Sequence, residues 1–377
     1  MTGSDPTRAG ATTTAAAPGG DRPAARATAA SLGGDRAGAS GPPRVVPAAE
    51  LRALAQAVLE RAGAPEETAA IVAASLVEAD LVGHESHGVR RLRIYTAFAE
   101  QGQVDPRATP EALPPDGATA VVDGHMGFGQ PAARLATGVV ARLAREHGTA
   151  TVAIRRCNHV GRLGEWVGAL ADDGLVALAL ANADPIVAPY GGRARRLGTN
   201  PLAWAVPRAR GVPPVVMDWA TAAMAEGKLA QARGRGEAAP EGVLVDAGGQ
   251  PSTDPGAFYD GGALLPFGAH KGSGLSVMIE LVGGILSGAG PSCLPEYDGT
   301  NGTVLTAIDA ARFTGEDAFR ATAERFCAEL AATPVAEGHE RVLAPGELEA
   351  RTAEARRRDG VPVAPGTWEE LQGLLHG

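Results

Sequence analysis

Residues 83–95, with the sequence GHESHGVRRLRIY, concentrate polar side chains between two apolar stretches of the chain. They bring together two histidines, one serine and three arginines. Ser86 precedes a run with helical periodicity, so we expect its hydroxyl to cap that helix and His87 and Arg91, four residues apart, to share one helix face. Such a pair is suited to holding an anion.

Composition limits what the rest of the chain can be. The chain has 377 residues, and a domain size of about 150 residues predicts two or three lobes. A net charge of -9 without a long basic run argues against nucleic-acid binding. No apolar run reaches the roughly 18 residues of a membrane span. Three cysteines without CxxC spacing indicate neither a disulfide framework nor a zinc site, so we expect a cytoplasmic protein.

The chain begins with a stretch of unusual composition. Residues 1–43 consist almost entirely of Ala, Gly, Thr, Pro, Ser, Asp and Arg, which cannot bury enough apolar surface to offset the cost of ordering. We therefore expect a disordered extension. A targeting peptide is the alternative, and the aspartates in the segment argue against it. Helical periodicity begins near Pro47 and predicts two helices before the polar segment and one after it.

A glycine-rich turn after a predicted strand at 119–122 raises the possibility of a Rossmann fold. Gly127, Gly129 and Ala132 have the spacing of a dinucleotide fingerprint between a strand and a helix. The next strand should end in an acidic residue that binds the ribose, yet it ends in Arg155 and Arg156. Arginines there could also accommodate the extra phosphate of NADP, so the residues alone leave this reading open.

Further polar residues lie where later strands are expected to end. His159 follows the strand at 151–154, where a histidine could transfer a proton or merely cap the next helix. Lys271 lies in a GAHKGSG turn that lacks P-loop spacing, so we expect an anion site without phosphoryl transfer. The cluster of His84, Glu85 and His87 is not HExxH and has no evident third ligand, so we expect no metal site and a structural role for His84. Cys157 is expected to be a packing residue.

Taken together, several corners of the chain resemble the type-2 malate/L-lactate dehydrogenase family over about residues 45–350. The matching segments are GHESHGVRRLRIY, CNHVGRLGEW, GTNPLAWAVP, MDWATAAMAEGK, LVDAGGQPSTDP and LLPFGAHKGSGLSVMIELVGGILSGA. The resemblance implies an α/β (α+β type) fold, with a non-Rossmann NAD(P)-binding domain on a mixed, largely antiparallel sheet flanked by helices, plus a helical domain. It also implies a homodimer. The expected boundaries are 1–43 for the extension, 44–118 for the helical part of the substrate domain, 119–304 for the cofactor domain and 305–377 for a segment that packs on the N-terminal helices.

The resemblance also implies an activity and a set of site residues. The family interconverts 2-hydroxy and 2-oxo acids with NAD or NADP, so the expected partner is a small carboxylate. His159 matches the proton donor, and Ser86, His87 and Arg91 match residues that line the substrate. A cyclic-imine carboxylate reductase and a non-catalytic ligand-binding homologue are the alternatives. The positions that match the cofactor region are Asn182, Thr199, Asn200, Asp218, Trp219, Ala220 and Lys271.

Two departures from the family pattern bear on the cleft. Cys157 stands where relatives often have a serine, and the segment between Lys228 and Pro266 is shortened. Either change could alter the cofactor preference or the wall of the cleft.

Overall fold

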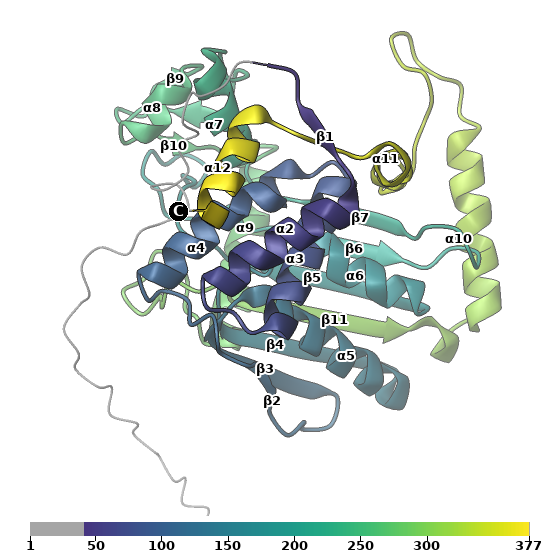
Figure 1. The fold of residues 1–377 in the computed structure, drawn as a ribbon. Coiled ribbons are helices and arrows are strands. Elements are labelled where there is room, and N and C mark those ends of the chain that lie inside the picture. The colour runs from purple at the N-terminus through teal and green to yellow at the C-terminus, as the bar shows by residue number, and fades with distance from the viewer. Residues whose placement is uncertain (1–40, 377) are drawn as a thin grey trace, which may run out of the picture.

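The computed structural model describes residues 41–376, which are built around a seven-stranded sheet (Figure 1). The disordered extension expected over residues 1–43 falls outside the described residues, apart from 41–43. In spatial order the strands are β2 (Glu111–Ala112), β3 (Thr119–Gly127), β4 (Thr149–Cys157), β11 (Thr303–Asp309), β5 (Leu175–Ala181), β6 (Leu202–Val206) and β7 (Val215–Trp219).

The sheet is mixed and largely antiparallel, as the resemblance implied. Only β3 and β4 pair in parallel, and β2, β11, β5, β6 and β7 each pair antiparallel with their neighbours. A Rossmann fold requires a run of parallel strands. The glycine turn at 127–132 therefore belongs to a single parallel crossover, in which α5 (Gly129–His147) links β3 to β4.

One face of the sheet is covered by α5 and by α6 (Leu163–Asp172). The core between them is rich in alanine and valine, and β5 shows why the sequence forms a strand there. Its odd-numbered residues from 175 to 181 are fully buried, and the intervening residues are only partly buried. This alternation has the period of two that a strand with one buried face requires.

A helical lobe packs beside the sheet and joins the two ends of the described chain. β1 (Arg44–Val46) pairs antiparallel with β12 (Val361–Val363), and α12 (Pro365–His376) packs on α2 (Ala48–Arg61). The buried residues of this lobe come from both its N-terminal and its C-terminal elements. The other helices of the lobe are α3 (Glu66–Leu81), α4 (Leu92–Glu100) and α11 (Glu347–Asp359).

A third, smaller unit lies between β7 and β11 in the sequence. It contains a three-stranded antiparallel sheet with its own apolar cluster. The α-helix that begins at His270 continues as a π-helix at Glu280–Ile285. The elements between β7 and β11 are α7 (Glu226–Arg235), β8 (Leu244–Val245), β9 (Pro251–Ser252), α8 (Pro255–Tyr259), β10 (Ala263–Leu264) and α9 (His270–Ile279). Helix α10 (Glu316–Ala331) comes after β11.

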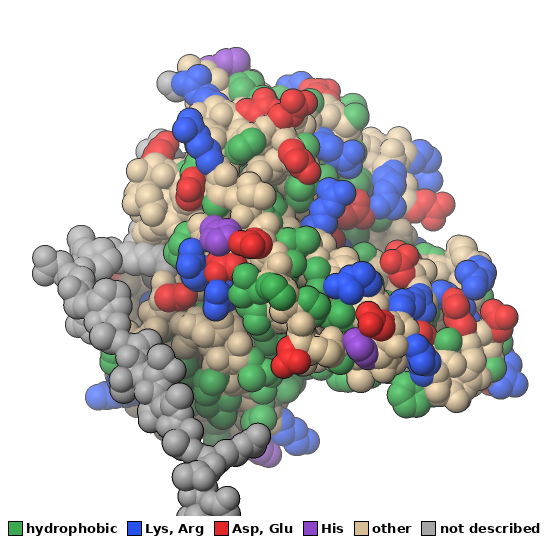
Figure 2. All heavy atoms as spheres, turned by 90° about the horizontal axis from the view of Figure 1, so that it is seen from below, with side chains coloured by type: hydrophobic (Ala, Val, Ile, Leu, Met, Phe, Trp, Pro, Cys, Tyr) green, Lys and Arg blue, Asp and Glu red, His purple; other side chains and the backbone are tan. Residues whose placement is uncertain are grey.

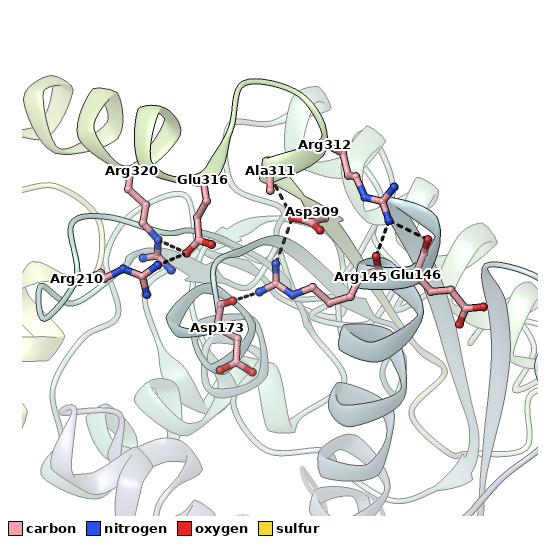
Figure 3. Close-up of polar contacts among 9 residues, drawn as sticks. All are labelled: Arg145, Glu146, Asp173, Arg210, Asp309, Ala311, Arg312, Glu316 and Arg320. Carbon is pink, nitrogen blue, oxygen red and sulfur yellow. Dashed lines mark hydrogen bonds and ion pairs between the residues drawn. The ribbon is translucent and has the colours of Figure 1, made fainter.

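Arginines satisfy the carbonyl groups at the ends of the two helices that cover the sheet (Figure 3). Arg312 donates to the backbone oxygens of Arg145 and Glu146, in the last turn of α5, at 2.7 and 3.0 Å. Arg145 in turn donates to the backbone oxygen of Asp173, just after α6, and to Asp309. Cations at helix C-termini satisfy carbonyl groups that lack an intrahelical partner and interact favourably with the helix dipole.

The surface carries charges of both signs. On the face drawn in Figure 2, basic and acidic side chains are intermixed and do not gather into one basic patch. Within residues 41–376, none of the helices is long and apolar enough to cross a membrane.

Candidate active site

The polar segment at residues 83–91 does not form the helix face that the sequence predicted. Residues Glu85–His87 and Val89–Arg91 form two short 3₁₀ turns, and α4 begins only at Leu92. Gly88 separates the turns in an extended conformation (φ -85°, ψ -160°), packed so closely on Asp80 that a Cβ would lie 1.8 Å from its Oδ1. The Asp80 carboxylate accepts from Val89 N at 2.8 Å, so Asp80 takes the capping role expected of Ser86.

Ser86, His87 and Arg91 nevertheless lie close together. The Ser86 hydroxyl lies 3.0 Å from His87 Nδ1, and Arg91 Nε donates to the backbone oxygen of Ser86 at 2.7 Å. That bond orients the guanidinium through Nε, while its two terminal nitrogens make no hydrogen bond to any described residue. A planar guanidinium held in this way can offer both nitrogens to a carboxylate.

His159, which is distant in the sequence, lies next to this group. It lies in the loop between β4 and α6, where its backbone N–H donates to Asn158 Oδ1 at 2.7 Å. Its Nδ1 lies 2.7 Å from the Tyr95 hydroxyl, and its ring centroid is 5.3 Å from that of His87. The structure therefore brings the expected proton donor to the expected substrate residues.

The surroundings keep both histidines neutral. Burial, aided by the positive charge of Arg91, lowers the pKa of His159 to about 3. Burial and the neighbouring His159 and Arg91 hold the pKa of His87 well below its usual range. Two neutral imidazoles beside a fixed arginine can bind an anionic substrate and exchange hydrogen bonds with its oxygen atoms.

The glycine turn before α5 supports the His159 loop. A Cβ on Gly129 would lie 2.3 Å from the backbone oxygen of Asn158 and 2.5 Å from that of His159, so only glycine allows this approach. The next residue, Gln130, is fully buried and donates to the Tyr95 hydroxyl at 2.9 Å. Phe128 packs on the Tyr95 ring with centroids 5.8 Å apart. Three consecutive residues within this turn, 128–130, thus contact the His159 loop or Tyr95.

A cavity of about 830 Å³ lies between α6, β7 and α11, and Ser86, His87, Arg91 and His159 are not among its lining residues. Arg162 lines it three residues after His159, and its buried Nε has no hydrogen-bond partner within the described chain. Asp218 also lines the cavity and accepts from Gly164 N at 2.7 Å through Oδ2. Burial raises the pKa of Asp218, partly offset by the charge of Arg162. The cavity thus has a donor without a partner and an acceptor near each other.

Asn182 and Asn200 lie outside that cavity and surround the buried carboxylate of Glu280. Glu280 accepts five hydrogen bonds, from the Asn182 and Asn200 amides, from Gly198 N, and from the backbone and hydroxyl of Ser292. Asn200 holds this arrangement with a φ of 38°. Both amides have protein partners, which fixes the loops after β5 and before β6.

The other positions expected to bind the cofactor are spread over the loops around β7 and α9. Trp219 points to the opposite face of the sheet from Asp218, as neighbouring strand residues must, and stacks edge-on against Phe267. Ala220 packs on the apolar cluster of the third unit, and the Thr199 backbone oxygen accepts from Thr221. Lys271 is exposed in the first turn of α9, after Ala269 with a φ of 55°. Of the seven positions, only Asp218 lines the cavity, and the cofactor role of the others stays a prediction.

Three residues of the site were absent from the sequence prediction. Tyr95 could have been found, because a tyrosine four residues after Arg91 falls on the same side of a helix. Gln130 and Arg162 follow glycine turns, and nothing in their spacing indicates that their side chains point inward.

Several minor expectations can be compared with the structure. His84 bonds Glu349 at 3.3 Å, in agreement with a structural role. Burial raises the pKa of the Cys157 thiol to about 12, so it remains protonated and acts as a packing group. Among residues 41–376, no group of three or more His, Cys, Asp or Glu side chains is arranged to hold a metal ion.

Comparisons with known proteins agree with this architecture. The sequence profile of the malate/L-lactate dehydrogenase family matches residues 46–372. An L-lactate dehydrogenase of Cupriavidus necator is 38% identical over 86% of this chain and 95% of its own length. A Δ1-pyrroline-2-carboxylate/Δ1-piperideine-2-carboxylate reductase of Pseudomonas putida is 40% identical over 87% and 95%. The solved structure of a putative malate/lactate dehydrogenase from E. coli superposes with a TM-score of 0.82 at 33% identity, over 88% of this chain and 94% of its own. The chain therefore belongs to the malate/L-lactate dehydrogenase family of oxidoreductases.

Proposed function

We propose that the protein interconverts a 2-hydroxy acid and a 2-oxo acid with NAD or NADP. The observation that carries the proposal is the grouping of Arg91 with two neutral histidines, His87 and His159. Arg91 would bind the substrate carboxylate through its two terminal nitrogens. His159 would exchange the proton at the substrate oxygen through Nε2, because Nδ1 is engaged by Tyr95.

The cavity is our candidate site for the nicotinamide cofactor, because of its size and the charged groups that line it. Its volume of about 830 Å³ lies in the range of roughly 300–1,000 Å³ typical of ligand sites. Arg162 would meet an anionic group of the cofactor, and the Asp218 carboxylate could accept from a hydroxyl. When bound, the cofactor supplies or accepts the hydride, and the protein's residues bind the acid and move a proton.

His87 is a second candidate for the proton exchange. Its Nδ1 is engaged by the Ser86 hydroxyl, as His159 Nδ1 is by Tyr95, so each ring has only Nε2 left for the substrate. The two assignments are separated by comparing His159→Asn with His87→Asn. The proton donor's variant should lose about 10²- to 10⁴-fold in kcat, whereas loss of a substrate-binding histidine should act mainly on KM.

Reduction of a cyclic-imine carboxylate is a second candidate activity, favoured by the identity of 40% to the reductase of Pseudomonas putida. Such a substrate would keep the carboxylate on Arg91 and present a C=N bond in place of C=O. Absorbance assays with NADH and NADPH, run against a panel of 2-oxo acids and cyclic imines, would identify both cofactor and substrate. A protein that oxidises neither cofactor with any of them would refute the proposed catalysis and favour a binding protein.

The protein is further proposed to act as a homodimer in the cytoplasm. Large exposed apolar side chains lie along α9 and the π-helix. On the sheet face opposite α5 and α6, Trp204 and Trp219 are 40% and 47% exposed. Exposed large apolar side chains that gather on one surface are typical of a subunit interface. Light scattering of the wild-type protein should give twice the mass of one chain. The Leu281→Glu variant should give the mass of a single chain. The helix residues are Val277, Met278, Leu281, Ile285 and Leu286.

The cytoplasmic assignment has separate support. Cys157, Cys293 and Cys327 are all free, as expected in a reducing compartment. Cell fractionation that recovers the protein outside the cytoplasm would contradict it.

A further inference from the structure

Two buried residues that the proposed chemistry does not use form a hydrogen-bonded chain behind His159. Gln130 Nε2 donates to the Tyr95 hydroxyl at 2.9 Å, and that hydroxyl lies 2.7 Å from His159 Nδ1. Tyr95 is 1% exposed and Gln130 is fully buried, so water does not compete for these bonds. Packing holds the chain in place, since Phe128 contacts the Tyr95 ring and Gly129 contacts the backbone of the His159 loop.

The direction of the chain follows from the donors and acceptors it contains. The Gln130 amide turns Nε2 toward the Tyr95 hydroxyl, while its buried Oε1 has no hydrogen-bond partner among the described residues. An amide nitrogen can only donate, so Gln130 in this orientation occupies a lone pair of the Tyr95 oxygen. The single hydroxyl hydrogen of Tyr95 is then free to point at His159 Nδ1. A neutral imidazole that accepts at Nδ1 carries its hydrogen on Nε2.

We propose that Tyr95, oriented by Gln130, is a positioning residue that fixes His159 in the tautomer with its hydrogen on Nε2. This inference rests on the proposed function of His159. It assigns the GFGQ turn, residues 127–130, a task in catalysis: the turn places the amide that sets the direction of the hydrogen-bond chain.

The arrangement explains how a histidine that is neutral at physiological pH can supply a proton. As the hydride reaches the carbonyl carbon, the Nε2 hydrogen passes to the carbonyl oxygen and the Tyr95 hydroxyl proton passes to Nδ1. The ring stays neutral, and the negative charge comes to rest on the Tyr95 oxygen. Burial raises the pKa of Tyr95 to about 12, and the Arg91 cation and the Gln130 N–H oppose this effect of burial. After the product leaves, water protonates Nε2 of the partly exposed His159 ring and the Nδ1 proton returns to Tyr95. Oxidation runs these transfers in reverse.

Nitrogen-15 NMR of the histidine side chains tests the tautomer directly, without a substrate. The wild-type protein should show His159, identified by its absence from His159→Asn, with a protonated Nε2 and an unprotonated Nδ1. Tyr95→Phe keeps the ring and removes the hydroxyl, so His159 should then populate both tautomers. A wild-type His159 with its hydrogen on Nδ1, or a Tyr95→Phe spectrum identical to wild type, would overturn the proposal.

Gln130→Glu tests the direction of the chain. An ionised carboxylate only accepts, so it would take the Tyr95 hydrogen and leave His159 to donate from Nδ1. In Gln130→Glu, the nitrogen-15 signals of His159 should therefore show the hydrogen on Nδ1. Gln130→Met offers no acceptor to Tyr95, so in that variant the hydrogen should not move to Nδ1. If Gln130→Glu folds and keeps the wild-type tautomer, Gln130 does not set the direction. If it does not fold, the Tyr95→Phe and Gln130→Met spectra decide.

Kinetics supply an independent readout. Tyr95→Phe should lower kcat about 10- to 100-fold with little change in KM, as expected when a histidine loses the partner that orients it. Thr96→Val removes a neighbouring buried hydroxyl that bonds only to Arg93 O, and it should keep wild-type kcat. Combined with His159→Asn, Tyr95→Phe should cause no further loss, and additive losses would contradict the proposal. A His159→Asn variant with wild-type kcat would refute the proposed function while leaving the tautomer result intact.

Discussion

Replacing Arg91 with lysine tests how the substrate is held. Arg91 Nε donates to the Ser86 backbone oxygen at 2.7 Å, and its two terminal nitrogens are free to bind a carboxylate. Lysine keeps the charge but loses the Ser86 bond and one of the two bonds to the carboxylate. At about 1.5–3 kcal/mol for each hydrogen bond to a charged group, and allowing for partial rescue, the expected loss is about 3–4 kcal/mol. That corresponds to a fall of roughly 10²- to 10³-fold in kcat/KM.

The assay compares a 2-oxo acid with the matching uncharged 2-oxo amide, following cofactor absorbance under steady-state conditions. The loss should appear with the acid and be much smaller with the amide, since only the acid uses the guanidinium fork. Arg93→Lys is the matched control, because Arg93 lies two residues further along and pairs with Glu370 at 3.7 Å. Equal losses with acid and amide would show that Arg91 acts on the structure of the site and does not bind the carboxylate.

Three further predictions concern the support of the site. Gly129→Ala should destabilise the protein by about 1–3 kcal/mol and lower kcat, because its Cβ would overlap the Asn158 and His159 carbonyls; unchanged denaturant midpoint and kcat would contradict this. Glu280→Gln places amide hydrogens against groups that already donate, so it should lower the free energy of unfolding by about 2–4 kcal/mol. A wild-type midpoint in chemical denaturation would contradict this. The pKa of His159 is lower in the folded protein than in the unfolded chain, so stability should fall as pH drops from about 6.5 towards 3, and His159→Asn should flatten that slope.

The sequence predicted the elements better than the contacts within the site. The strands expected at 119–122 and 151–154 lie within β3 and β4, and the two helices expected before the polar segment are α2 and α3, because buried faces follow the local period of the element. The motif resemblance supplied the family and the mixed sheet, which periodicity alone could not, since the choice between parallel and antiparallel pairing depends on distant parts of the chain.

Local patterns failed where a distant residue decides the geometry. The helix expected from Ser86 onward is interrupted at Gly88 because the Asp80 side chain occupies the space a side chain would need. Glu280 was an isolated charge in an apolar run, and only the fold shows the five donors around it. Tyr95 and Gln130 are 35 residues apart, so no local spacing could reveal that they meet at His159.

The contacts of α11 have a consequence for the order of events during synthesis. Glu349 bonds His84, and Arg356 pairs with Glu85 at 2.7 Å, so both residues before Ser86 are held by the end of the chain. β1 likewise finds its partner strand only in residues 361–363. A nascent chain can therefore assemble the sheet on the ribosome while its substrate-binding segment still lacks these contacts. We expect activity to appear only after release, and ribosome-stalled chains ending before residue 347 to be folded in part yet inactive.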